Sequence, residues 1–211
     1  MELELKKECL DTYELGEPQT LTQEETAETI VPDYCPDIAR IISAEGVVCL
    51  HGGTEQDGVT GTVRVTVLYT PENESGVRAL EFAMPFSAQG EGLAGCAHVV
   101  VETEIELLES RMLNPRKIFT RCKLVTHLAG CRKVCLTISS DAETDPALLV
   151  EKRCCGQTVS LLRQVAEKDL TFSETMSLSL GREGAAELLH CRANGIVTET
   201  KAIGNLSLIH I

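Results

Sequence analysis

Apolar and polar residues alternate most regularly in residues 58–69, which read GVTGTVRVTVLY. Val63, Val65 and Val67 would face one side of a strand, and the residues between them are polar. A period of two with one polar face is typical of a half-buried antiparallel strand. Residues 98–107, HVVVETEIEL, follow the same pattern, so the sequence predicts a mainly β fold.

Turn-forming residues separate the expected strands. Glycine, proline, asparagine or acidic residues gather at residues 71–76 and 90–95, and Gly130 interrupts a later apolar stretch. Short strands at this spacing favour a sandwich or a barrel over a parallel α/β sheet. We therefore expect an antiparallel β-sandwich or a barrel-like domain.

One stretch departs from the β pattern. Pro36 suits the first position of a helix, and Asp37 would stabilise the first turn. Ile38, Ile41 and Ile42 are spaced as one apolar stripe of a helix. The sequence predicts a helix of about two turns here, ending near the next glycine.

A weak internal repeat has an offset of 149 residues. Without a gap it sets Glu25 and Thr26 on an identical pair, and Gly-Val-Val at 46–48 on Gly-Ile-Val at 195–197. A strand, a short helix and a second strand would then recur, with the second helix at residues 183–190. One short helix per repeat unit is therefore expected.

The repeat divides the chain into three parts. We expect a complete β domain in residues 1–150 and the start of a second, truncated unit in residues 151–205. Residues 206–211, LSLIHI, look like the translation of a transposon adapter used in sequencing libraries, and we expect this tail to be non-native. Incomplete strands of the second unit would leave an unpaired sheet edge, so self-association is also expected.

Charge is unevenly distributed along the chain. The net charge of -13 argues against nucleic acid and anionic membranes as partners, because both would repel an acidic protein. Residues 1–60 hold 14 acidic and 3 basic residues, whereas residues 111–135 hold no acid. This basic segment is a candidate interaction surface for an acidic partner or for the chain's own acidic part, and the outward face of two strands is the simpler alternative. Its cations are Arg111, Arg116, Lys117, Arg121, Lys123, Arg132 and Lys133.

The sequence also bears on location. The first ten residues lack the pattern of a secretory signal, and no apolar run approaches the roughly 20 residues that span a bilayer. A cytosolic location without membrane insertion is expected. In a reducing compartment, most of the 10 cysteines would behave as small buried apolar side chains.

Motifs for catalysis and cofactors are incomplete. Residues 90–95 match G-x-G-x-x-G, but a β-branched stretch follows where a dinucleotide site needs a helix. Cys96 and His98 share a strand face without an evident orienting group. Cys131 and Cys135 also share a face, yet structural zinc sites favour tighter ligand pairs. We expect no enzyme activity, no catalytic residues, no cofactor and no metal.

Four stretches together resemble the SPOCS domain of clostridial sporulation proteins. They are residues 28–42 (ETIVPDYCPDIARII), 58–69, 85–87 (PFS) and 114–118 (NPRKI). The resemblance covers roughly residues 1–140 and resumes from Glu174. Its motif residues in this sequence are Pro32, Asp33, Pro36, Asp37, Ile38, Ile41, Gly61, Tyr69, Pro85 and Phe86.

The resemblance implies a non-enzymatic scaffold that takes part in spore-coat or envelope assembly through protein contacts. SipL-type members carry tandem SPOCS units followed by a LysM module, which is associated with docking to the coat-morphogenetic ATPase on the forespore surface in the mother-cell cytosol. This chain shows no LysM pattern, so the partner-binding part would lie in missing sequence. The alternative is a soluble β domain that binds a glycan or another small ligand. Only three Tyr and four Phe are available to stack on sugar rings, which weakens that alternative.

Overall fold

The computed structural model describes residues 4–51 and 58–143, and from the rest of the chain residues 151, 153, 156, 158, 160–162, 171, 173, 175, 188–193, 195, 196, 198–203 and 206–210. All regular elements within these residues are β-strands, and all of their pairings are antiparallel. The prediction of a mainly β, antiparallel fold is confirmed. Within the same residues, no helix is long and apolar enough to cross a membrane.

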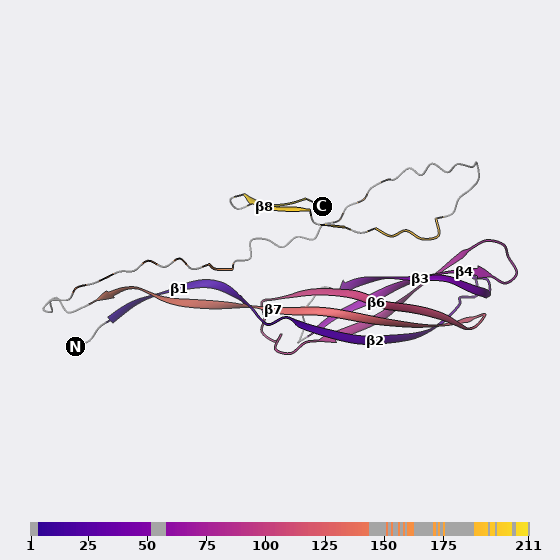
Figure 1. Ribbon diagram of the computed structural model, residues 1–211, viewed down its shortest axis with the longest axis horizontal. Coiled ribbons are helices and arrows are strands. Elements are labelled where there is room, and N and C mark those ends of the chain that lie inside the picture. The colour runs from indigo at the N-terminus through magenta and orange to yellow at the C-terminus, as the bar shows by residue number, and fades with distance from the viewer. Residues whose placement is uncertain are drawn as a thin grey trace.

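The strands form two larger sheets and one separate hairpin (Figure 1). The first sheet contains β1 (Glu4–Leu15), β2 (Gln19–Ile30), β6 (His98–Asn114) and β7 (Lys117–Glu143). The second contains β3 (Ile38–His51), β4 (Gly58–Pro71) and β5 (Arg78–Gln89), and the hairpin joins β8 (Glu199–Ile203) to β9 (Leu206–His210).

Strand β7 is 27 residues long and organises the first sheet. Its residues 117–128 pair with β2 on one edge and with β6 on the other. Cys131 pairs with Leu15 of β1 and also with His98 of β6, so β1 continues along the edge that β2 occupies. Beyond that point β1 and β7 leave the body as a two-stranded ribbon (Figure 1). We call this ribbon, β1 with residues 131–143, the arm.

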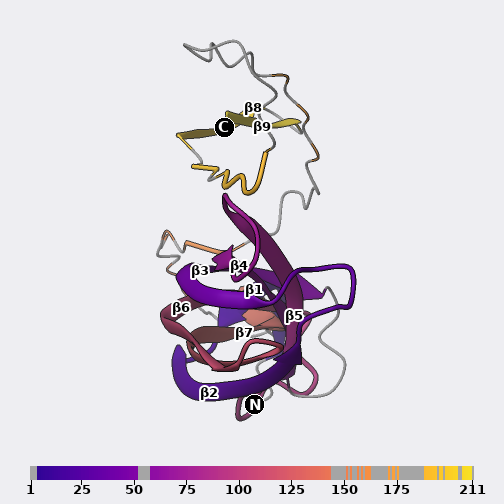
Figure 2. The ribbon, with the colours of Figure 1, turned by 90° about the vertical axis from the view of Figure 1, so that its right-hand side faces the viewer.

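The two sheets enclose the larger of two clusters of buried apolar residues. Strand β3 lies against β6 and β5 against β2, so six strands surround the core as a flattened barrel, seen end-on in Figure 2. Every second residue of β7 points inward, and Ile118, Cys122 and Leu124 are fully buried. They pack in the same cluster as Val63 and Val65 of β4. The alternation that the sequence showed in residues 58–69 therefore marks the inner face of the barrel.

Two buried threonines on the inner face of β7 have hydroxyl partners on β6. Thr120 lies 2.8 Å from the hydroxyl of Ser110, and Thr126 lies 3.1 Å from that of Thr103. An unpaired buried hydroxyl would cost free energy, so these pairs allow polar residues to line the core.

Two glycines permit close approach inside the barrel. A Cβ atom on Gly46 would lie 2.8 Å from Cδ1 of Ile105, where β3 crosses β6. A Cβ atom on Gly61 would lie 2.5 Å from Cζ of Phe86, its cross-strand partner. The Phe86 ring therefore covers Gly61 directly, an arrangement that stabilises a glycine within a strand.

The prediction of a helix after Pro36 is wrong, because the residues from Ile38 onward form strand β3. The register between β3 and β4 shifts after Ile38 and again after Ile41. Each shift inserts one residue, so the side chains that reach the core are Ile38, Ile41 and Ala44, three positions apart. Two bulges in a strand thus reproduce the apolar spacing of a helix.

Three other expectations concern the second helix, Gly130 and the second unit. The second helix, at residues 183–190, lies mostly outside the described residues, and the described Leu188, Leu189 and His190 are not helical. Gly130 is not a turn but lies inside β7, where a Cβ atom would come within 2.6 Å of the Cys96 sulfur. The expected second unit, residues 151–205, also falls largely outside the described residues.

Candidate functional site

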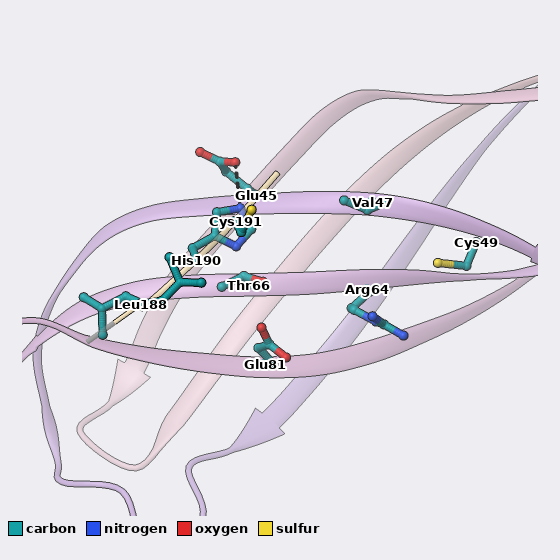
Figure 3. Close-up of a pocket in the computed structure, with 10 residues that line it drawn as sticks. Glu45, Val47, Cys49, Arg64, Thr66, Glu81, Leu188, His190 and Cys191 are labelled. Carbon is teal, nitrogen blue, oxygen red and sulfur yellow. Dashed lines mark hydrogen bonds and ion pairs between the residues drawn. The ribbon is translucent and has the colours of Figure 1, made fainter. Parts of the chain in front are cut away.

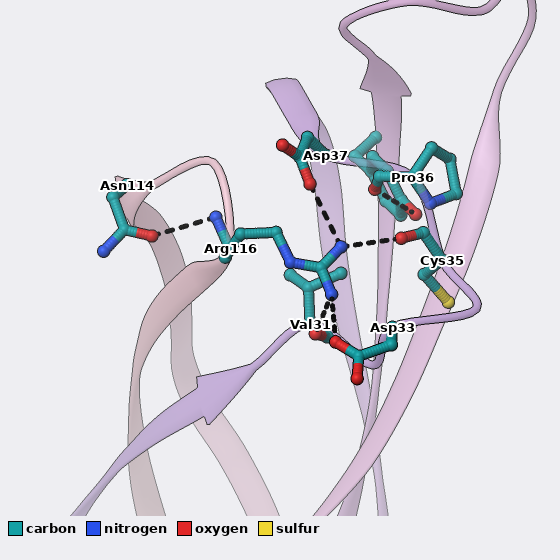
Figure 4. Close-up of polar contacts among 8 residues, drawn as sticks. Val31, Asp33, Cys35, Pro36, Asp37, Asn114 and Arg116 are labelled. Carbon is teal, nitrogen blue, oxygen red and sulfur yellow. Dashed lines mark hydrogen bonds and ion pairs between the residues drawn. The ribbon is translucent and has the colours of Figure 1, made fainter.

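Arg116 clamps the loop that leads from β2 in one sheet to β3 in the other. Its Nη1 donates to the carbonyl of Cys35 at 2.8 Å and to the carboxylate of Asp37 at 3.0 Å (Figure 4). Its Nη2 donates to the carbonyl of Val31 at 2.8 Å and to the carboxylate of Asp33 at 3.1 Å. The planar fork of a guanidinium group suits such divergent acceptors, whereas an ammonium group does not. One side chain therefore fixes the path of the chain between the sheets.

Backbone hydrogen bonds hold the Arg116 turn and the loop together. The Val31 N–H donates to the Arg116 carbonyl, and the Ile38 N–H donates to the Pro115 carbonyl, each at 2.9 Å. The side-chain oxygen of Asn114 accepts from the Arg116 N–H at 2.9 Å. The turn between β6 and β7 is thus locked to both ends of the loop, and we call the whole arrangement the Arg116 clamp.

The structure brings the motif residues together in two groups. Pro32, Asp33, Pro36 and Asp37 lie in the clamped loop, and the Tyr69 hydroxyl donates to the Pro36 carbonyl at 3.3 Å. The remaining motif residues lie on the strands that the loop feeds: Ile38 and Ile41 on β3, Gly61 on β4, and Pro85 and Phe86 on β5. The motif therefore describes how the two sheets are joined and packed.

Sequence reasoning placed Arg116 among surface cations and missed its role in the clamp. The signal was available, because Arg116 falls within the NPRKI stretch of the resemblance. Its side chain is 33% exposed, and it contacts two backbone carbonyls that a charge count along the sequence does not register.

The other predicted cations also contact the chain itself. Arg132 donates to the Gly92 carbonyl at 2.6 Å, and Arg111 lies 4.8 Å from the centre of the Phe119 ring. The remaining four form ion pairs across neighbouring strands: Lys117 with Glu28, Arg121 with Glu24 at 3.0 Å, Lys123 with Glu106 at 2.8 Å, and Lys133 with Asp11 at 3.1 Å.

Three of those carboxylates belong to the acidic first 60 residues. The basic strand β7 lies between the acidic strands β1 and β2 on one edge and β6 on the other. Cross-strand charge complementarity of this kind favours the observed register, although each exposed pair contributes only about 0–1 kcal/mol. The acidic and basic segments are therefore partners within the fold.

A pocket of about 320 Å³ lies on the outer face of β3, β4 and β5 (Figure 3). Glu45, Arg64 and Glu81 contribute charged groups, and residues 188–191 form the opposite wall. His190 Nε2 lies 3.2 Å from a carboxylate oxygen of Glu45. The described lining contains no Phe, Tyr or Trp.

A second pocket, of about 460 Å³, lies between the β1–β2 turn and the turn before β6. The Gln19 amide donates to the Glu91 carbonyl at 2.6 Å and accepts from the Glu91 N–H at 2.8 Å. Arg132 also borders this pocket, where it donates to the Gly92 carbonyl. The glycine-rich stretch is thus a turn anchored by side-chain contacts, and β6 follows it rather than a helix.

The cysteines differ from the sequence expectation. A disulfide joins Cys9 of β1 to Cys135 of β7, so Cys135 is not available to form a thiolate pair with Cys131. Of the described cysteines, Cys122 is fully buried and the others are at least partly exposed, so the prediction that most are buried is wrong. Cys96 donates its thiol to the Gly92 carbonyl at 3.8 Å. Within the described residues, no cluster of His, Cys, Asp and Glu could hold a metal ion.

Among the described residues, three side chains have displaced pKa values. Burial raises the pKa of Tyr69, and burial raises the pKa of the Cys122 thiol to about 11. A hydrogen bond to Asp11 raises the pKa of Lys133. All three changes move the pKa of the group further above neutral pH.

No protein-family model matches the chain, and searches of the curated proteins and of the solved structures found no match.

Proposed function

We propose that this chain is a non-enzymatic interaction module of the SPOCS type that contributes to spore-coat or envelope assembly through protein contacts. One observation carries the proposal: two separate stretches of the resemblance, residues 31–37 and 114–118, meet at the Arg116 clamp. Residues that resemble a family motif and also hold one another in place support a shared fold better than scattered matches do.

The chemistry of the described residues supports a scaffold over an enzyme. General acids and bases work best when their pKa lies near the working pH. The pKa values of Tyr69, Cys122 and Lys133 are instead raised, which moves them further above neutral pH. The Gln19 amide beside the second pocket is occupied by the Glu91 backbone. These groups serve the fold, and they leave protein contacts as the function that the chain supports best.

The proposed setting is the mother-cell cytosol at the forespore surface, where a reducing environment would keep the Cys9–Cys135 link open and the arm would be held by its strand pairing. The partners would be coat-morphogenetic proteins. The charge of -13 is compatible with such a role, because it disfavours nucleic acid and anionic membranes as competing partners.

Deleting the gene in its host and examining the spores by electron microscopy would test the proposal. We expect coats that are misplaced or incomplete. Complementation with the Lys117→Met variant should restore the coat, whereas complementation with Arg116→Met should restore it poorly because the clamp is lost. Normally encased spores in the deletion strain would rule the proposal out.

A glycan-binding β domain is the second candidate, and the pocket beside Glu45 favours it. Its volume of about 320 Å³ is at the lower end of the range for small-ligand sites, roughly 300–1,000 Å³. Sugar faces usually stack on the rings of Tyr, Trp or Phe, and the described lining holds none of these residues. Equilibrium binding to peptidoglycan fragments would discriminate between the candidates, since a scaffold should show no detectable affinity.

A further inference from the structure

The outer edge of β1 in the arm already carries a strand-type contact. In an antiparallel strand, successive N–H groups point alternately to the two edges. Gly16 donates its N–H to the Gly130 carbonyl of β7 at 2.7 Å, so the N–H of Tyr13, three residues earlier, points to the opposite edge. There it donates to the Leu162 carbonyl at 3.1 Å, and the two residues form an antiparallel bridge.

The neighbouring side chain completes this contact. The Thr12 hydroxyl donates to the Leu162 carbonyl at 3.1 Å and accepts from the Leu162 N–H at 3.1 Å. Both backbone groups of Leu162 are therefore bonded to two adjacent residues of β1. The contact consists of three hydrogen bonds, in which both the N–H and the carbonyl of Leu162 have a partner on β1.

The two bridged residues occupy equivalent positions in the internal repeat. Tyr13 and Leu162 are 149 residues apart, which is the offset that aligns Glu25 and Thr26 with Glu174 and Thr175. The alignment was fixed by residues 25–48 and did not use either bridged position. When equivalent positions of two like units meet antiparallel, the contact has the geometry that a twofold axis produces.

We propose that the outer edge of β1 is the surface on which two repeat units of this kind join, by antiparallel pairing centred on Tyr13 and its equivalent Leu162. The occupant in this chain is the segment that carries Leu162, within the second unit. The proposal rests on the internal repeat and the bridge, and it does not depend on a role in spore-coat assembly.

The exposure of the arm supports this assignment. Leu5 and Leu15 of β1 are 45% and 51% exposed, and Leu136 of β7 is 37% exposed, although the barrel buries its inward aliphatic residues. An edge strand with free backbone groups and exposed apolar side chains is a ready template for another strand. Pairing with an equivalent strand would cover such an edge on both units at once.

Hydrogen exchange of single amides in the full chain, measured by NMR, would test the proposal. The Tyr13 amide should be protected, and Thr12→Val should speed its exchange roughly tenfold, because the variant removes both hydroxyl bonds to Leu162. Thr22→Val makes the same change on an exposed position of β2 and should leave the Tyr13 amide unaffected. An unprotected Tyr13 amide in the unaltered chain, or an unchanged rate in Thr12→Val, would overturn the proposal.

Tyr13→Pro gives a second, independent test. Proline removes the outward N–H, and β7 does not use that group, so the pairing between β1 and β7 should survive. We expect the Leu162 amide to exchange at least tenfold faster while the Cys9–Cys135 link still forms, as peptide mapping would show. Unchanged protection of Leu162 would contradict the proposed pairing. If the link fails to form, the arm itself is lost and the Thr12→Val result decides.

Mixed isotope labelling identifies the occupant. In a sample that combines two differently labelled chains, contacts between Tyr13 and Leu162 should be found only within one chain. Contacts between differently labelled chains would show that a second copy occupies the edge, and this would overturn the assignment of Leu162 in the same chain.

Discussion

Replacing Arg116 by methionine should destabilise the body of the protein strongly. Methionine keeps much of the apolar stem but removes all four side-chain hydrogen bonds to the loop between the sheets. The carbonyls of Val31 and Cys35 would lose their guanidinium partner, and only backbone hydrogen bonds would still join the loop to the β6–β7 turn.

The size of the effect follows from the exposure of each acceptor. Hydrogen bonds that involve a charged group contribute roughly 1.5–3 kcal/mol each. Each of the two carbonyl contacts is assigned about 1.5 kcal/mol, the lower end of this range, because the Arg116 side chain is one-third exposed. Asp33 is fully exposed and is left out, and Asp37, 43% exposed, adds less than about 1 kcal/mol. The sum is about 3–4 kcal/mol, or a decrease in Tm on the order of 10 °C.

Urea denaturation followed by circular dichroism would measure this free energy, with Lys117→Met as the matched control. Lys117 is the next residue along the chain and forms an exposed pair with Glu28, so its loss should cost less than about 1 kcal/mol. Arg116→Lys should recover only part of the loss, because a single ammonium group cannot reach four divergent acceptors. If Arg116→Met and Lys117→Met are equally stable, the clamp does not hold the sheets together.

Three further outcomes are expected. Gly46→Val should cost roughly 1–3 kcal/mol in the same denaturation assay, because the new side chain meets Ile105 at 2.8 Å, whereas Gly156→Ala, with open space around it, should be neutral. Cys122 should resist iodoacetamide in the folded protein while the exposed Cys191 reacts, as mass spectrometry of the labelled peptides would show, and comparable labelling would contradict the burial. The free energy of unfolding should fall between pH 9 and about 11, because the unfolded chain releases the Cys122 proton above its ordinary pKa of 9.0 while the folded chain keeps it up to about 11; Cys122→Val should flatten this slope.

The strands were predictable where alternation is uninterrupted. In residues 58–69 and 98–107, apolar and polar residues alternate because each strand has one face toward the core. The other face points toward solvent or toward charged side chains of the neighbouring strands. Strand β3 was not predictable in the same way. Its two bulges place Ile38, Ile41 and Ala44 inward at a spacing of three, and a local pattern cannot distinguish that spacing from the period of a helix.

The candidate site was predictable in its components but not in its arrangement. The composition identified the basic segment, and the resemblance identified the loop, yet neither indicated that Arg116 joins them. A charge at position 116 can form ion pairs with many acids, and only the crossing of the chain between two sheets puts the Val31 and Cys35 carbonyls within its reach. Contacts 81 and 85 residues apart along the chain have no local signal.

The length of β7 has a mechanical consequence. At about 3.3 Å per residue, its 27 residues extend roughly 90 Å, from the β6–β7 turn at one end of the barrel to the tip of the arm. Tension applied at the tip would act along the strand, parallel to its neighbours and perpendicular to the hydrogen bonds that β2 and β6 form with it. Those bonds would be loaded in shear and would have to break together rather than one after another. A protein that transmits force between attached neighbours would benefit from such a strand, because the load would pass through the barrel without opening it.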